Sequence, residues 1–83
     1  MYSAQLTNTA LKALHQLPRK LQNNAAKAIG RLKSNPRLGE PLKGKLKGKW
    51  KLRFSRYRII YQIFDQKLLI LIFDIGHRKD IYR

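Results

Sequence analysis

The sequence predicts a two-layer α+β domain in which two helices cover one face of an antiparallel sheet. The prediction rests on a change of hydrophobic period along the chain. Apolar residues recur at helical spacing between residues 7 and 34, and they alternate with polar residues from about residue 49 onward. A chain of 83 residues has the size of one domain, so we expect residues 1–83 to fold as a single unit.

The first half of the chain predicts a short strand followed by two helices. Residues 2–6 alternate between apolar and polar side chains, which is typical of a half-buried strand. A helix can follow, with either Thr7 or Thr9 as its N-cap. Pro18 ends this helix and also suits the first turn of a second amphipathic helix, which Pro36 stops.

The second half predicts a loop followed by a three-stranded meander. Residues 37–49 are rich in glycine and lysine and are expected to form the loop. One strand then begins near residue 49, a second covers residues 57–64, and a third covers residues 68–75 before Gly76 closes it. The third strand is apolar on both faces, so we expect it to lie in the middle of the sheet.

The charge balance predicts an anionic partner. Nineteen lysine and arginine residues stand against four acidic residues, which gives a formal net charge of +15. So strong a positive field favours binding to nucleic acid or to an acidic protein. The chain has no cysteine, which excludes a disulfide framework and a thiol nucleophile and fits the reducing cytoplasm. Its longest apolar run is too short to cross a membrane, and no signal peptide is expected.

Basic residues are expected to gather on one face of the hairpin that joins the first two meander strands. If Ser55 and Arg56 are its two central residues, Arg53 lies opposite Arg58, and Lys51 faces Ile60 on the same side. Directly opposed like charges cost about 0.2–1 kcal/mol, so they are not there for stability. A phosphate between the two guanidinium groups would explain the arrangement.

The residue types on this face favour RNA cleavage that uses the 2′-hydroxyl of the substrate. Four scattered acidic residues do not suit a two-metal site, so neither a metal nor another cofactor is expected. A pair of histidines would need His15 beside His77, but His15 falls on the first helix. What remains is a base, an acid and cations that stabilise the pentavalent phosphate. Lys51 is the base candidate, because neighbouring cations should lower its pKa, and Arg53 supplies charge stabilisation.

Three residues after the last strand complete the candidate site. Arg78 can act as a phosphate ligand or proton donor, and Tyr82 can stack on a base and orient the attacking oxygen. His77 either titrates near neutrality beside the site or satisfies backbone groups at the strand end. Other basic residues are expected to make nonspecific contacts with RNA phosphates, namely Lys43, Lys45, Lys47, Lys49 and Arg56.

Residues 50–83 resemble the C-terminal half of the RelE/ParE toxin superfamily of type II toxin–antitoxin systems. The resemblance lies in the basic alternating strand, in YRIIYQI, in the acidic turn with the apolar strand after it, and in GHRKDIY. The preceding strand–helix–helix order agrees with it. The resemblance implies two helices against an antiparallel sheet, and a toxin that a cognate antitoxin neutralises by wrapping it. We expect the antitoxin to be acidic.

For the RelE branch, the resemblance further implies entry into the ribosomal A site and metal-free cleavage of mRNA there. Carried over by position, the functional residues of that branch fall on Lys51, Arg53, Arg58, Arg78 and Tyr82. RelE enzymes have a second lysine where this chain has Arg53, which leaves Lys51 as the better base candidate.

Two other functions remain open at this point. A ParE-like toxin would keep the fold and inhibit DNA gyrase by protein contact without nuclease activity. A non-catalytic RNA-binding protein would also be strongly basic. On the basic face, four apolar residues are expected to need a cover that the antitoxin supplies, namely Ile60, Leu69, Leu71 and Phe73.

Overall fold

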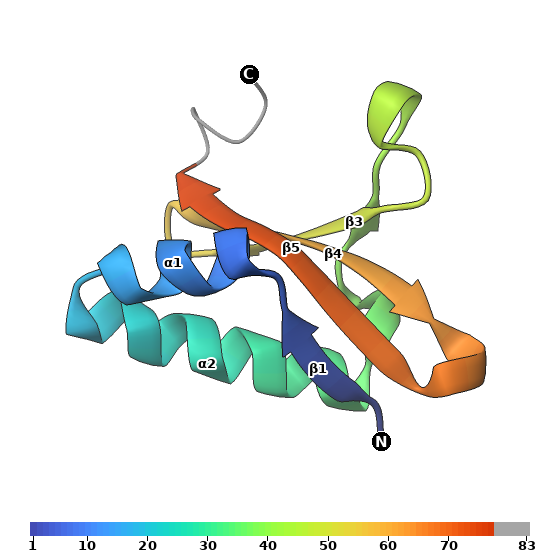
Figure 1. Cartoon of the computed structure of the whole chain (residues 1–83), viewed down its shortest axis with the longest axis horizontal. Coiled ribbons are helices and arrows are strands. Elements are labelled where there is room, and N and C mark those ends of the chain that lie inside the picture. The colour runs from blue at the N-terminus through green and yellow to red at the C-terminus, as the bar shows by residue number, and fades with distance from the viewer. Residues whose placement is uncertain (78–83) are drawn as a thin grey trace.

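The computed structural model describes residues 1–77, which build two helices on one face of a five-stranded sheet (Figure 1). The strands are β1 (Ser3–Leu6), β2 (Glu40–Pro41), β3 (Trp50–Phe54), β4 (Tyr57–Phe64) and β5 (Leu69–His77). The helices are α1 (Asn8–Gln16) and α2 (Arg19–Ser34), and short 3₁₀ turns cover Pro36–Leu38, Gly44–Leu46 and Asp65–Lys67. The predicted α+β order of strand, two helices and antiparallel meander is confirmed.

The sheet is mixed, with the strand order β1-β5-β4-β3-β2. β1 pairs with β5 in parallel, and the other neighbours are antiparallel. β5 therefore has a partner on both edges, which confirms its predicted interior position. Two boundaries differ from the prediction. β5 continues through Gly76 to His77 because Gly76 pairs with Arg58, and the two-residue strand β2 lies inside the segment predicted as loop.

A register shift in β5 determines which of its side chains face the helices. Ile60 pairs with Asp74, whereas the next residue, Tyr61, pairs with Ile72, so Phe73 is the extra residue of a bulge. Ile72 and Ile75 are three positions apart and would face opposite sides of a regular strand. Because of the bulge, both join the buried core beneath the helices.

The core lies between the helices and the sheet. Alanines at positions 10, 25 and 28 are fully buried, and their small side chains let the helices approach the strands closely. Leu52 and Phe54 are buried against this layer and Trp50 packs at its edge, so these side chains form the inward face of β3. Lys51 and Arg53 therefore point to the opposite face.

Thr7 anchors the start of α1 to the sheet. Its Oγ1 accepts a hydrogen bond from the Ala10 amide at 3.1 Å, so Thr7 is the N-cap among the two candidates. The same hydroxyl donates to the Phe73 carbonyl oxygen at 2.8 Å. One side chain thus caps the helix and ties it to the bulge of β5.

An exposed cluster joins the N-terminus to two turns. The Asp65 carboxylate accepts a hydrogen bond from the Tyr2 hydroxyl at 2.6 Å and forms an ion pair with Arg37, with Nη2 and Oδ2 2.7 Å apart. Hydrogen bonds from Arg37 and then Tyr2 hold the pKa of Asp65 below its ordinary value. The cluster links the turn between β4 and β5 to the segment that leads into β2.

This cluster predicts a specific acid dependence of stability. Because the folded state depresses the pKa of Asp65, its contribution to the free energy of unfolding is present above the ordinary carboxyl pKa of about 3.9. That contribution is lost as the pH falls through the folded pKa. We expect Asp65→Asn to lower the urea midpoint at about pH 7, and this loss should shrink progressively as the pH falls below the ordinary carboxyl pKa. A loss that stays constant over the acid range would contradict this explanation.

Within residues 1–77, neither helix has the length and apolar character that a membrane span needs.

Candidate functional site

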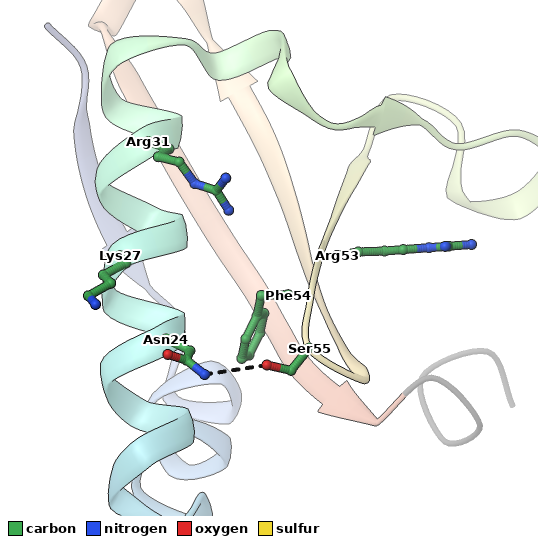
Figure 2. Close-up of a pocket in the computed structure, with 6 residues that line it drawn as sticks. All are labelled: Asn24, Lys27, Arg31, Arg53, Phe54 and Ser55. Atoms are coloured by element: carbon green, nitrogen blue, oxygen red, sulfur yellow. Dashed lines mark hydrogen bonds between the residues drawn. The ribbon is translucent and has the colours of Figure 1, made fainter.

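The β3–β4 hairpin has the predicted register, which determines where its basic side chains lie. Phe54 pairs with Tyr57, Arg53 with Arg58, and Lys51 with Ile60. Ser55 adopts a positive φ of 53°, a conformation that two-residue hairpins require and that serine rarely takes. Asn24 of α2 donates a hydrogen bond to the Ser55 hydroxyl at 3.4 Å and so helps to hold the turn (Figure 2).

Lys51, Arg53 and Arg58 share the sheet face that points away from the helices, as predicted. Their exposure differs. Arg53 is exposed, Lys51 is half-buried, and Arg58 is only 6% exposed. Arg53 is therefore open to an incoming phosphate, whereas Arg58 contributes its positive charge from beneath the surface.

A carboxylate that the sequence analysis did not select also belongs to this face. Glu40 of β2 lies directly opposite Lys51 of β3, and its Oε2 is 3.7 Å from the Lys51 Nζ. The two side chains form an ion pair across the strands. A carboxylate can itself accept a proton, so Glu40 is a second candidate for the base.

A buried tyrosine positions the segment that carries Glu40. The Tyr61 hydroxyl donates to the Pro36 carbonyl oxygen at 2.7 Å and accepts from the Gly39 amide at 3.2 Å. Burial raises the pKa of Tyr61, although the hydrogen bond from Gly39 and the charge of Arg37 lower it in part. The phenol therefore stays protonated at neutral pH and can donate this bond.

Gly39 is required for the close approach of β2 to β3. A Cβ atom at this position would lie 2.2 Å from the Lys51 carbonyl oxygen and 2.7 Å from the Tyr61 hydroxyl. Real Cβ atoms do not come so near to backbone, so only glycine fits without a shift of the strand. Glu40 thus follows a residue whose position is set by contacts on both sides.

His77 lies on the other side of the sheet from Lys51. It pairs with Tyr57, and the two rings meet edge to face with their centroids 5.5 Å apart. Tyr57 in turn stacks on Phe54, which faces the helices. The expectation that His77 stands beside the basic residues is therefore not met, because the strand alternation turns its side chain away from them.

The remaining predicted residues fall into two groups. Arg78 and Tyr82 lie outside the described residues. Lys43, Lys45 and Lys47 are exposed on the loop before β3, and Arg56 is exposed at the hairpin turn. Lys49 differs, because it is half-buried with its Nζ 4.8 Å from the centre of the Phe73 ring. This cation–π contact brings the end of the basic loop over β5.

A shallow groove of about 540 Å³ separates α2 from the hairpin end of β3 (Figure 2). Lys27 and Arg31 of α2 line one wall, and Phe54 and Ser55 line the other. The backbone of Arg53 borders the groove, but its side chain points away from it (Figure 2). Arg53 therefore serves the basic sheet face, whereas Lys27 and Arg31 form a separate basic surface on the helix layer.

The apolar residues of the basic face are covered to different degrees. Ile60 is only 5% exposed, so the expectation that it needs an external cover is wrong. Leu69, Leu71 and Phe73 are half-buried and leave apolar surface beside the cations. Among residues 1–77, no three histidine, aspartate or glutamate side chains are grouped as a metal site would need.

The chain combines a small two-layer α+β fold with a basic face on its sheet. A family model described as ParE toxin of type II toxin-antitoxin system, parDE, matches residues 4–82. The chain therefore belongs to this family, within the RelE/ParE toxin superfamily that the sequence resembles.

Relatives within the superfamily are RelE-like. The toxin RelG of Mycobacterium tuberculosis is 37% identical over 84 residues, covering 99% of this chain and 97% of that protein. The mRNA interferase toxin RelE of Escherichia coli K12 is 29% identical over 83 residues, covering 94% of this chain and 84% of that protein. In the solved toxin–antitoxin complex RelBE2 of Mycobacterium tuberculosis, one chain matches with a TM-score of 0.85 and 34% identity. That match covers 93% of this chain and 98% of the other. The protein is thus a RelE-family toxin of a toxin–antitoxin system.

Proposed function

We propose that this toxin is a ribosome-dependent mRNA endonuclease that works without metal and acts in the cytoplasm. The observation that carries the proposal is the hairpin register, which puts Lys51, Arg53 and Arg58 on one face of the sheet. The E. coli relative is named an mRNA interferase, which supports the same activity for this chain. Arg53 is exposed on this face, and its forked guanidinium group suits the phosphate of RNA.

The proposed reaction is an internal transfer at phosphorus. A base, either neutral Lys51 or Glu40, removes the proton of the 2′-hydroxyl, and the oxygen attacks the adjacent phosphorus. The bond from phosphorus to the 5′-oxygen breaks, which leaves a cyclic phosphate on one fragment and a 5′-hydroxyl on the other. Arg53 stabilises the added negative charge of the pentavalent state. Arg78 and Tyr82 remain candidates for the proton donor and for orientation of the nucleotide.

The proposed partners follow from the charge and from the apolar surface of the basic face. We propose that an acidic antitoxin wraps the toxin and covers Leu69, Leu71 and Phe73. The solved complex of a 34% identical relative with its antitoxin supports such a partner. The exposed lysines of the loop before β3 would contact ribosomal RNA, where binding is sequence-independent and weakens with salt.

The proposed function is tested by mapping mRNA 5′ ends in a translating extract that contains the toxin. We expect cuts at codon-defined positions, and we expect Arg78→Ala to abolish them. Naked mRNA in the same buffer, without ribosomes, should stay intact. Random cutting of naked mRNA would refute ribosome dependence, and intact mRNA in the translating extract would refute the nuclease.

A second candidate function is inhibition of DNA gyrase. The match to a family described by a ParE toxin favours it. In that case mRNA stays intact in the extract while purified gyrase accumulates cleaved DNA. The lysine and arginine pair on β3 would then be dispensable, because the inhibition would depend on protein contact.

A further inference from the structure

We propose that Glu40 is a specificity-determining residue that competes with phosphate for Lys51. An anion that binds Lys51 must compete with the Glu40 carboxylate. The inference rests on the proposed function in one respect, since it takes the face of Lys51 and Arg53 as the RNA-binding surface. In this proposal, an acidic residue determines which polyanions the basic toxin binds.

The geometry places the Glu40 carboxylate on the solvent side of Lys51. Glu40 and Lys51 are direct cross-strand neighbours, with Oε2 and Nζ 3.7 Å apart. The side chain of Glu40 is 75% exposed, whereas that of Lys51 is 22% exposed. A phosphate that approaches Lys51 from solvent therefore comes close to a negative charge.

The position of Glu40 is set by the fold. Gly39 packs against the Lys51 carbonyl group, where no side chain would fit. The buried Tyr61 hydroxyl bonds both Pro36 and Gly39, so the segment before Glu40 is held at two points. Because Glu40 is tethered next to Lys51, its carboxylate has a high effective concentration at that lysine. A phosphate that is free in solution cannot reach such a concentration.

The charge composition makes this placement informative. The chain has four acidic residues in 83, and Glu40 is the one that lies directly opposite Lys51. An ordinary exposed ion pair stabilises a protein only slightly. On a surface with so many cations, however, the pair with Glu40 makes Lys51 less available for nonspecific binding of anions. A phosphate that the exposed Arg53 guanidinium holds at the same time can still displace Glu40.

The test measures binding of a fluorescein-labelled single-stranded RNA with 2′-O-methyl riboses, which lacks the attacking hydroxyl. Fluorescence anisotropy gives its Kd over a series of salt concentrations. We expect Glu40→Gln to tighten binding by about fivefold at low salt, from removal of one charge about 4 Å away. The slope of log K against log salt should steepen by about 0.7, because one more phosphate is neutralised.

The matched control is Gln16→Lys. Gln16 is exposed at the end of α1, on the layer opposite the basic face, and this variant has the same net charge as Glu40→Gln. We expect its Kd to change by less than about twofold and its salt slope to stay the same. Equal effects of the two variants would overturn the inference, because net charge alone would then explain both.

Two further variants separate position from charge. Tyr61→Phe keeps every charge but releases the segment before Glu40, so it should tighten binding in the same direction by a smaller factor. Circular dichroism establishes that this variant is folded under the assay conditions. In a Lys51→Met background, Glu40→Gln should have no more effect than Gln16→Lys. A full effect in that background would show that Glu40 does not act through Lys51.

This binding test and the test of the proposed nuclease can fail separately. If the extract shows no mRNA cuts while Glu40→Gln still tightens binding through Lys51, the nuclease proposal falls and this inference stands. If mRNA is cut but the two charge variants behave alike, the inference falls and the nuclease stands. Absence of any RNA binding by the unmodified chain would count against both.

Discussion

Replacement of Arg53 with alanine should slow mRNA cleavage by about 10²–10³-fold, the loss that follows removal of one preorganised donor from a charged transition state. Arg53 is the exposed guanidinium of the basic sheet face, and its side chain points away from the groove beside α2 (Figure 2). The measurement is single-turnover cleavage of mRNA on programmed ribosomes. Arg53→Lys should recover part of the rate, because the charge returns without the forked donors.

Lys27→Ala is the matched control for Arg53→Ala. It removes the same charge from the wall of the groove on the helix layer, at a residue that does not share the basic sheet face. We expect its cleavage rate to stay within about threefold of the unmodified toxin, since it changes only the long-range field. Equal losses in the two variants would mean that Arg53 acts through net charge and not at the reacting phosphate.

Gly39→Ala should destabilise the toxin by about 1–3 kcal/mol, which is the range observed when extra atoms are forced into a packed site. The added methyl group would meet the backbone carbonyl of Lys51, which cannot rotate out of the way as a side-chain end could. The strand β2 must then move, and Glu40 moves with it. Urea unfolding gives the loss of stability, and the RNA titration gives the change at Lys51.

Gly30→Ala is the control for this substitution. Gly30 lies within α2, and a Cβ atom there would have no neighbour within 4 Å. Alanine favours the helix over glycine, so this variant should be more stable by about 0.5–1 kcal/mol. If Gly39→Ala were as stable as the unmodified toxin and kept the Glu40–Lys51 pair, the segment before Glu40 would not be held as described.

Local pattern was sufficient to predict the hairpin and its faces. Ser55 and Arg56 separate two segments of alternating apolar residues and so define the turn. The alternation then places Lys51 and Arg53 on the face of the strand away from the buried Leu52 and Phe54. The burial of Arg58 could not be read from the same pattern, because alternation reports the face of a residue but not what covers it. The alternation therefore indicates which residues form the basic face but not how far each is exposed to solvent.

Two interpretations of His77 were open from the sequence, a position beside the site or a role in satisfying backbone groups at the strand end. The structure contradicts the first for a related reason. The structure continues β5 through Gly76, so alternation places His77 with Tyr57 on the helix side. A glycine in an otherwise apolar strand does not reveal whether pairing stops or continues there.

The sequence by itself determined the types and order of the main elements, the basic face of the hairpin and the resemblance to RelE-like toxins. These features depend on spacing within short segments, where the period of apolar residues reports the local backbone directly. The tertiary structure decided that Glu40 faces Lys51. That contact depends on β2, which has only two residues and is too short to show a hydrophobic period. It also depends on the Tyr61 hydroxyl, which bonds Pro36, 25 positions away in the chain. Packing between distant segments is set by the whole core, so no local pattern records it.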